Sequence, residues 1–128
     1  VFSSGKIICT GAKNMEEIDN TVKNLIDKIK QTGTSVNEEP DVKTQNIVAS
    51  SNFNKEMQLG SIAKKLLSEH VEYEPEQFPG LVYRLDDIGV VMLLFSSGKI
   101  VCTGAKKLED VSHAVETMKD KLTSIGAL

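Results

Sequence analysis

The chain has 128 residues, of which 40% are hydrophobic and 26% charged, a composition typical of a soluble globular protein. This length predicts one cooperative unit with a single core and excludes two independent domains. The net charge of −3 argues against a protein that wraps DNA through a basic surface, so a nucleic-acid ligand would have to be held largely by apolar contacts. The chain has no apolar run long enough to span a bilayer and no signal-peptide pattern at its start.

The first 33 residues predict a hairpin followed by a helix. The segment Phe2-Ser-Ser-Gly-Lys-Ile-Ile-Cys-Thr-Gly-Ala-Lys13 has the pattern of a strand end, a tight turn, a second strand and an exit into a helix. Asn14 with Glu17 three residues later is typical of a helix start, and Gly33 of a helix end. Apolar residues lie between them at helical spacing on one expected buried face: Ile18, Val22, Leu25, Ile26 and Ile29.

A polar stretch, residues 34–41, contains Pro40 and predicts a linker. Lys43–Ser51 then alternates as a strand does, with Asn46, Val48 and Ser50 on one side. The helix expected after it has one apolar face: Leu59, Ile62, Ala63, Leu66 and Leu67.

The last third of the chain predicts further strands and a final helix. A loop holds Phe78 between two prolines and leads to strands at Leu81–Leu85 and Val90–Phe95, which the turn Asp86-Asp87-Ile88-Gly89 separates. Phe95–Lys106 then repeats the first hairpin almost residue for residue, and a helix over Leu108–Ile125 follows it. One structural unit is therefore expected twice: a partial copy in residues 1–33 and a complete copy in residues 42–128.

The complete copy orders as strand, helix, four strands and helix, which predicts the α+β class with an antiparallel β-sheet and its helices on one face. Val90–Phe95 is apolar on both sides of the strand, although helices would cover one side only. The other face of the sheet should therefore be apolar and open. Its expected members are Asn46, Val48, Phe78, Val82, Arg84, Leu93, Phe95, Val101 and Thr103.

Two kinds of partner fit such a face. Apolar sheet faces most often meet protein, so a homodimer or a stacked sheet is one interpretation. The other is the minor groove of DNA, where amides and hydroxyls reach acceptor edges and aromatic side chains enter base steps. The residues alone leave both open.

The sequence predicts no enzyme, no cofactor and no metal site. His70 and His113 are far apart and are expected at the surface or in packing. Ser-Ser-Gly-Lys lacks the glycine spacing of a phosphate loop. Cys9 and Cys102 occupy equivalent places in the two copies, which favours structural thiols over a disulfide or zinc.

Three sets of motifs resemble the TATA-box-binding protein family, most closely its archaeal branch: Gln45-Asn-Ile-Val48, Glu72-Tyr-Glu-Pro-Glu-Gln-Phe-Pro-Gly-Leu-Val-Tyr-Arg84, and the two Phe-Ser-Ser-Gly-Lys hairpins. The resemblance covers almost the whole chain. It implies the saddle-repeat fold of that family, with one complete repeat and the C-terminal part of another.

The resemblance also implies roles for individual residues. DNA-intercalating residues would be Phe2, Phe78 and Phe95. Other DNA contacts would come from Asn46, Val48, Val82, Arg84, Leu93, Ser97, Lys99, Val101 and Thr103 and, in the first copy, from Ser4, Lys6, Ile8 and Thr10. Glu74, Glu76 and Gln77 would dock transcription factor B.

A protein of this family would be a general transcription initiation factor that binds the minor groove of TATA-box promoter DNA, bends it, and recruits transcription factor B and the RNA polymerase initiation complex. Its place would be the cytoplasm, on the nucleoid, in an archaeon, or the nucleus in a eukaryote. The alternative is a related module that dimerises through the sheet face without binding DNA.

One departure from the family pattern is large. The first repeat lacks its opening strand, its first helix, its first loop and the phenylalanine that would pair with Phe2. We expect that the sequence is a fragment, that self-association with a second chain completes the sheet, or that binding is impaired.

Overall fold

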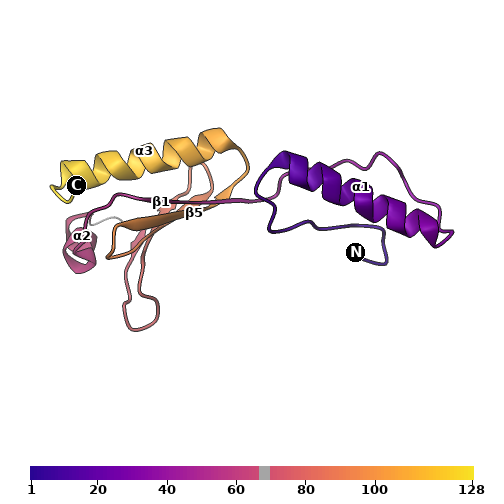
Figure 1. Cartoon of the computed structure of the whole chain (residues 1–128). Coiled ribbons are helices and arrows are strands. Elements are labelled where there is room, and N and C mark those ends of the chain that lie inside the picture. The colour runs from indigo at the N-terminus through magenta and orange to yellow at the C-terminus, as the bar shows by residue number, and fades with distance from the viewer. Residues whose placement is uncertain (67–69) are drawn as a thin grey trace. The chain divides into compact units, whose positions relative to one another are not determined.

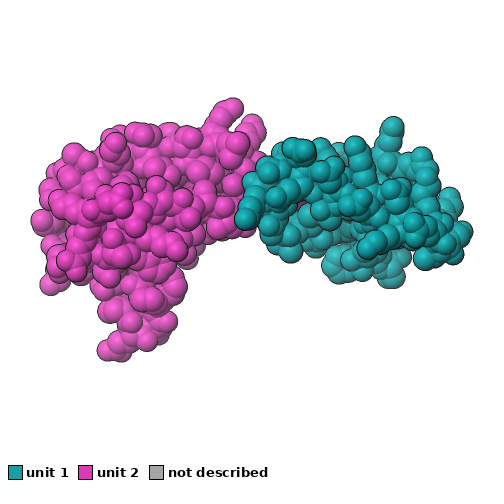
Figure 2. Space-filling model, in the orientation of Figure 1, with its two compact units in different colours: residues 1–42 teal, residues 43–128 magenta. Residues whose placement is uncertain are grey.

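The computed structural model describes residues 1–66 and 70–128 and divides the chain into two compact units, residues 1–42 and 43–128 (Figures 1 and 2). The length predicts a single unit, whereas the structure divides into two. Leu67, predicted on the apolar face of the second helix, lies outside the described residues. Among the described helices, none combines the length and the apolar character needed to cross a membrane.

The first unit is built around helix α1, Met15–Gln31. Its start follows the prediction: the Asn14 side chain accepts a hydrogen bond from the Glu17 amide at 2.9 Å, and the Glu17 carboxylate accepts one from the Lys13 amide at 2.8 Å. Gly33, at φ 84°, follows the last turn as expected. The apolar face is only partly covered, because Val22 is buried while the other four predicted residues are half-buried.

The hairpin predicted in residues 1–13 forms its turn but not its strands. The Phe2 amide donates to the Lys6 carbonyl at 2.8 Å, and the Gly5 amide to the Phe2 carbonyl at 2.9 Å. Within residues 1–42 the structure assigns no strand, and Ile8 is 64% exposed. The strand prediction is wrong here because a turn closes through local bonds, whereas a strand requires a neighbour for its ladder.

The second unit contains a five-stranded antiparallel sheet and two helices (Figure 1). In chain order the elements are β1 (Ile47–Asn52), α2 (Leu59–Leu66), β2 (Val71–Glu72), β3 (Leu81–Leu85), β4 (Val90–Leu94), β5 (Lys99–Ala105) and α3 (Leu108–Ser124). The order in the sheet is β1-β5-β4-β3-β2. The predicted sequence of strand, helix, four strands and helix is confirmed. Strand β1 starts later than predicted, at Ile47.

Alternate residues of the strands form the core against both helices. The buried positions on the sheet include Leu81, Tyr83, Met92, Leu94, Ile100 and Cys102. They pack with Leu59 and Ile62 of α2 and with Ala114, Met118 and Leu122 of α3. Full burial of a large apolar side chain contributes about 1.5–3 kcal/mol, so this face of the sheet supplies most of the stabilising burial. The predicted α+β class, with helices on one face, is confirmed.

Candidate nucleic-acid interface

The opposite face of the sheet, called here the open face, carries the other set of alternating side chains. They are Val82 and Arg84 of β3, Val91 and Leu93 of β4, Val101 and Thr103 of β5, and Val48 and Ser50 of β1. Ladder partners place Ser50, Val101, Leu93 and Val82 in one row across four strands. The predicted apolar members therefore share a face. Among the apolar side chains of the open face, Val48 is 64% exposed and four others are half-buried: Val82, Val91, Leu93 and Val101.

Val91 is a member of this face that the sequence prediction left out. It pairs with Arg84 on one side and Thr103 on the other, so it lies in the next row of the sheet. The signal was present in the sequence, because Val91 has the same strand parity as Leu93 and Phe95.

Phe78 and Phe95 meet at one end of the open face. Their ring centroids are 5.9 Å apart and the ring planes meet at 68°, an edge-to-face pair. Phe95 continues β4, while Phe78 is held in the loop after β2 by its amide, which donates to the Glu74 carbonyl at 2.9 Å. Phe78 remains 38% exposed. Two large aromatic side chains are thus presented together at the edge of an apolar surface.

Asn46 lies just before β1, where the ladder with β5 shifts register between Ile47 and Ala49. Its amide oxygen accepts a hydrogen bond from the Gly104 amide at 2.7 Å. This bond orients the exposed side chain and uses its acceptor, so the remaining polar group is the NH2 donor. The sequence predicted Asn46 on this side of the sheet. It could not predict the bond to Gly104, which depends on the β-bulge that causes this register shift.

The cations of the face are few. Arg84 Nη2 lies 3.7 Å from Glu72 Oε2 of the neighbouring strand, with both side chains about half-exposed, so the pair is weak. Lys99 is exposed, and its amide donates to Ser97 Oγ at 3.4 Å within the turn. The Glu72 carboxylate beside Arg84 was not anticipated.

The remaining predicted residues lie in two exposed segments. Glu74, Glu76 and Gln77 are exposed in the loop between β2 and β3, where the Gln77 amide donates to the Glu74 carbonyl at 2.9 Å. The first-copy residues belong to the separate first unit and are all exposed: Phe2, Ser4, Lys6, Ile8 and Thr10. Lys6 and Ser4 repeat the Lys99–Ser97 bond at 3.4 Å.

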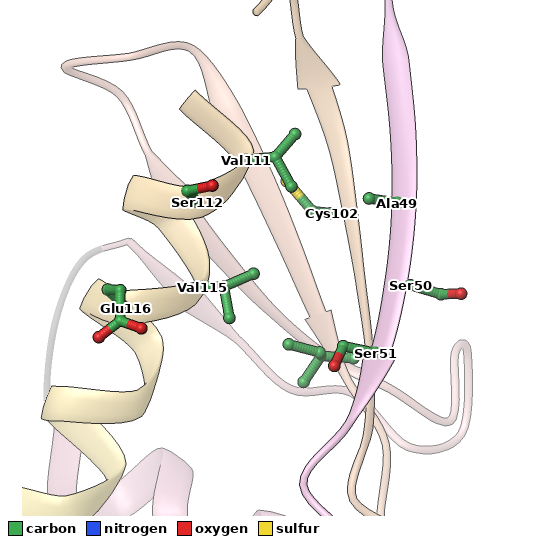
Figure 3. Close-up of a pocket in the computed structure, with 9 residues that line it drawn as sticks. Ala49, Ser50, Ser51, Cys102, Val111, Ser112, Val115 and Glu116 are labelled. Carbon is green, nitrogen blue, oxygen red and sulfur yellow. The ribbon is translucent and has the colours of Figure 1, made fainter. Parts of the chain in front are cut away.

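A groove of about 280 Å³ lies on the helix-covered face, between α3 and the strands β1 and β5 (Figure 3). Val111 and Val115 project from α3 toward the strands, and Glu116 supplies a carboxylate at the rim. Burial raises the pKa of the Cys102 thiol in its wall, so this sulfur is held protonated at neutral pH. Over the described part of the chain no three His, Cys, Asp or Glu side chains gather as a metal site would require.

Comparison with known proteins gives a consistent result. The family model described as "Transcription factor TFIID (or TATA-binding protein, TBP)" matches residues 1–32 and 41–125. Proteins named TATA-box-binding protein from Thermoplasma volcanium and Archaeoglobus fulgidus are each 50% identical over 128 residues, which cover 100% of this chain and 70% of theirs. The solved structure "Methanococcus jannaschii TBP" matches with a TM-score of 0.81 and 47% identity, over 89% of this chain and 64% of that chain. This chain therefore spans less than two thirds of that solved protein, and it belongs to the TATA-binding protein family.

Proposed function

We propose that this protein is a general transcription initiation factor that binds the minor groove of T·A-rich promoter DNA, the TATA box, through the open face. The observation that carries the proposal is the pairing of a half-buried apolar face with two phenylalanines at its end. Family membership supports it, because the relatives are named for TATA-box binding. No catalytic or cofactor role is proposed.

In this proposal the apolar side chains of the open face lie along the floor of a widened minor groove. Adenine N3 and thymine O2 are acceptors there, whereas guanine adds an amino donor. The Asn46 NH2 group, with its oxygen already bonded to Gly104, would donate to those acceptors and disfavour the guanine amino group. Easily kinked TA steps would add selectivity.

The Phe78–Phe95 pair would act as a wedge in one base step. Unstacking a step costs a few kcal/mol, which apolar contact with the bent duplex offsets. Arg84, Lys99 and Ser97 would contact phosphates and fix the register. From the first copy, Phe2, Ser4, Lys6, Ile8 and Thr10 would make the equivalent contacts on the other half of the site.

The test is the bending of a doubly labelled TATA-containing duplex, measured by fluorescence energy transfer with the full chain. Phe78→Ala and Phe95→Ala should each reduce bending and weaken binding about tenfold or more, since each removes part of the wedge. Leu108→Ala is the control, because Leu108 is 73% exposed at the start of α3. Unchanged bending in both phenylalanine variants would refute the proposal.

The alternative function, a module that dimerises through its sheet face, makes the opposite prediction. It requires a dimer by light scattering that Leu93→Asp dissociates, with no affinity of the wild-type chain for any duplex. The same samples decide between the two, because Leu93 lies in the central row of the open face.

We further propose that the exposed loop with Glu74, Glu76 and Gln77 docks transcription factor B and so recruits the polymerase initiation complex. Glu74→Arg should leave duplex binding within about twofold and weaken the ternary complex about tenfold or more, because a reversed charge opposes a cationic partner. Glu116→Arg, an exposed site on α3, is the control. A gel shift with both proteins measures this, and equal ternary affinities for the two variants would contradict it.

The proposal also includes self-association of the chain and its site of action in the cell. Strand β1 is one of the two outer strands of the described sheet, and the longer of them, since β2 has two residues; outer strands invite pairing with another chain. Self-association at β1 would extend the open face across two chains, and the mass of the chain in solution tests it.

The archaeal sources of the relatives support a site of action on the nucleoid.

A further inference from the structure

Gly80 lies beneath the two phenylalanine rings. It precedes β3 directly, and because Leu81 pairs with Leu94, Gly80 falls opposite Phe95 in the ladder. Its place in the strand alternation is that of Val82, so its missing side chain would point to the open face. Gly80 is buried although it has no side chain of its own, so atoms of other residues cover its backbone. The rings of Phe78 and Phe95 therefore occupy the space above its backbone.

The geometry explains why this position has no side chain. A Cβ added to Gly80 would lie 2.8 Å from Cε1 of Phe78 and 3.1 Å from Cε1 of Phe95, both shorter than an ordinary carbon–carbon contact. The backbone gives no competing reason, because Gly80 lies outside the left-handed region. What glycine supplies at this position is room for the rings.

We infer that Gly80 is a positioning residue for DNA bending: it lets the Phe78 and Phe95 rings stand together as one wedge. This inference rests on the proposed function. An alanine at this position would displace the Phe78 ring, which is 38% exposed, rather than the backbone, and that movement costs the fold little. The two rings would then no longer enter a base step as a unit.

The experiment compares Gly80→Ala with Gly60→Ala in the full chain. Gly60 is the matched control, because a Cβ there would lie 4.0 Å from Cε2 of Tyr73, an ordinary contact. In the free protein, Gly80→Ala should remove the nuclear Overhauser effects between the two rings while the Tm changes by less than about 3 °C. On the labelled TATA duplex it should reduce bending and weaken binding about tenfold. Gly60→Ala should leave the ring contacts, the bending and the duplex affinity unchanged.

A second background separates positioning from a structural role. With Phe78 already replaced by alanine, Gly80→Ala should weaken duplex binding by less than about twofold, since the closer ring is gone. If Gly80→Ala alone fails to fold, the double variant should recover folding, and continued unfolding would overturn the inference. Wild-type ring contacts and bending in Gly80→Ala would overturn it as well. If the wild-type chain does not bend the duplex, the proposed function fails, while the ring contacts still test the role of Gly80.

Discussion

At the scale of single residues, a hydrogen bond from the backbone to Asn46 determines which group of its side-chain amide is left to contact a ligand. An amide has an acceptor and a donor, and the 2.7 Å bond from the Gly104 amide engages the acceptor. The donor is what the minor groove of T·A pairs requires. Under the proposed function, orientation of the side chain and selectivity of the face would thus have the same cause, the β-bulge that brings Gly104 to Asn46.

Replacing Asn46 by aspartate separates these two roles. The carboxylate retains an oxygen for Gly104, so the Tm should fall by less than about 4 °C. The donor is lost and a negative charge faces the DNA, so affinity for the TATA duplex should drop at least about tenfold. Asn37→Asp is the control, because Asn37 also accepts a backbone bond, from the Glu39 amide at 3.0 Å, and is not one of the proposed DNA contacts. Equal losses for the two variants, measured by fluorescence anisotropy, would contradict a specific role for Asn46.

At the scale of elements, the repeated hairpin places almost the same twelve residues in two environments. Its turn is the same in both copies: Phe95 and Lys99 are bonded at 2.9 Å, as Phe2 and Lys6 are at 2.8 Å. After the turn the copies differ, since β5 is paired on both sides while residues 6–12 have no assigned strand. Local sequence therefore determines the turn, and the neighbours determine the strand.

The same distinction explains what could be predicted from the sequence. Helix ends, turns and strand parity depend on residues close in the chain, and they gave the order of elements and most members of the open face. Contacts that depend on ladder register could not be read in this way. Arg84 reaches Glu72 because β2 pairs with β3, and the edge-to-face angle of the phenylalanines depends on a loop meeting a strand.

Thiol labelling tests the difference between the two copies. Cys9 is exposed, whereas Cys102, its counterpart in β5, is 1% exposed. Burial raises the pKa of Cys102 above its ordinary value of 9.0, so less of its reactive thiolate is present at pH 8. Iodoacetamide at pH 8 should therefore modify Cys9 quickly and Cys102 only on unfolding, as peptide mass spectrometry will show. Equal protection of the two cysteines would mean that the first copy is a paired, buried strand.

The raised pKa also gives a stability prediction of known sign. A group whose pKa is higher in the folded than in the unfolded state contributes stability below its unfolded pKa and loses it as the pH rises through the folded value. The contribution of Cys102 should therefore be complete at neutral pH and decline above about pH 9. Cys102→Ala should flatten that alkaline decline in the pH profile of the Tm, which thermal unfolding across this pH range measures.

At the scale of the whole molecule, the acidic net charge and the apolar open face both favour, under the proposed function, a complex with DNA that depends mainly on apolar contact. A chain with a net charge of −3 attracts DNA poorly at long range, so under the proposed function binding would have to come from apolar contact and from a few cations near the groove. The candidate phosphate contacts include three cations, Lys6, Arg84 and Lys99, and Glu72 partly neutralises Arg84. Such a surface should release few counterions when it binds.

The salt dependence of binding measures this directly. Each neutralised phosphate contributes about −0.9 to the slope of log K against log salt, so three cations predict a slope of about −3 or slightly shallower. Lys99→Ala should make the slope shallower by about one, while Lys119→Ala on α3 should leave it unchanged. Titrations of the TATA duplex between about 50 and 200 mM salt give these values. A wild-type slope steeper than about −6 would mean that a basic surface elsewhere on the protein carries the binding, because the three candidate cations are too few to produce it.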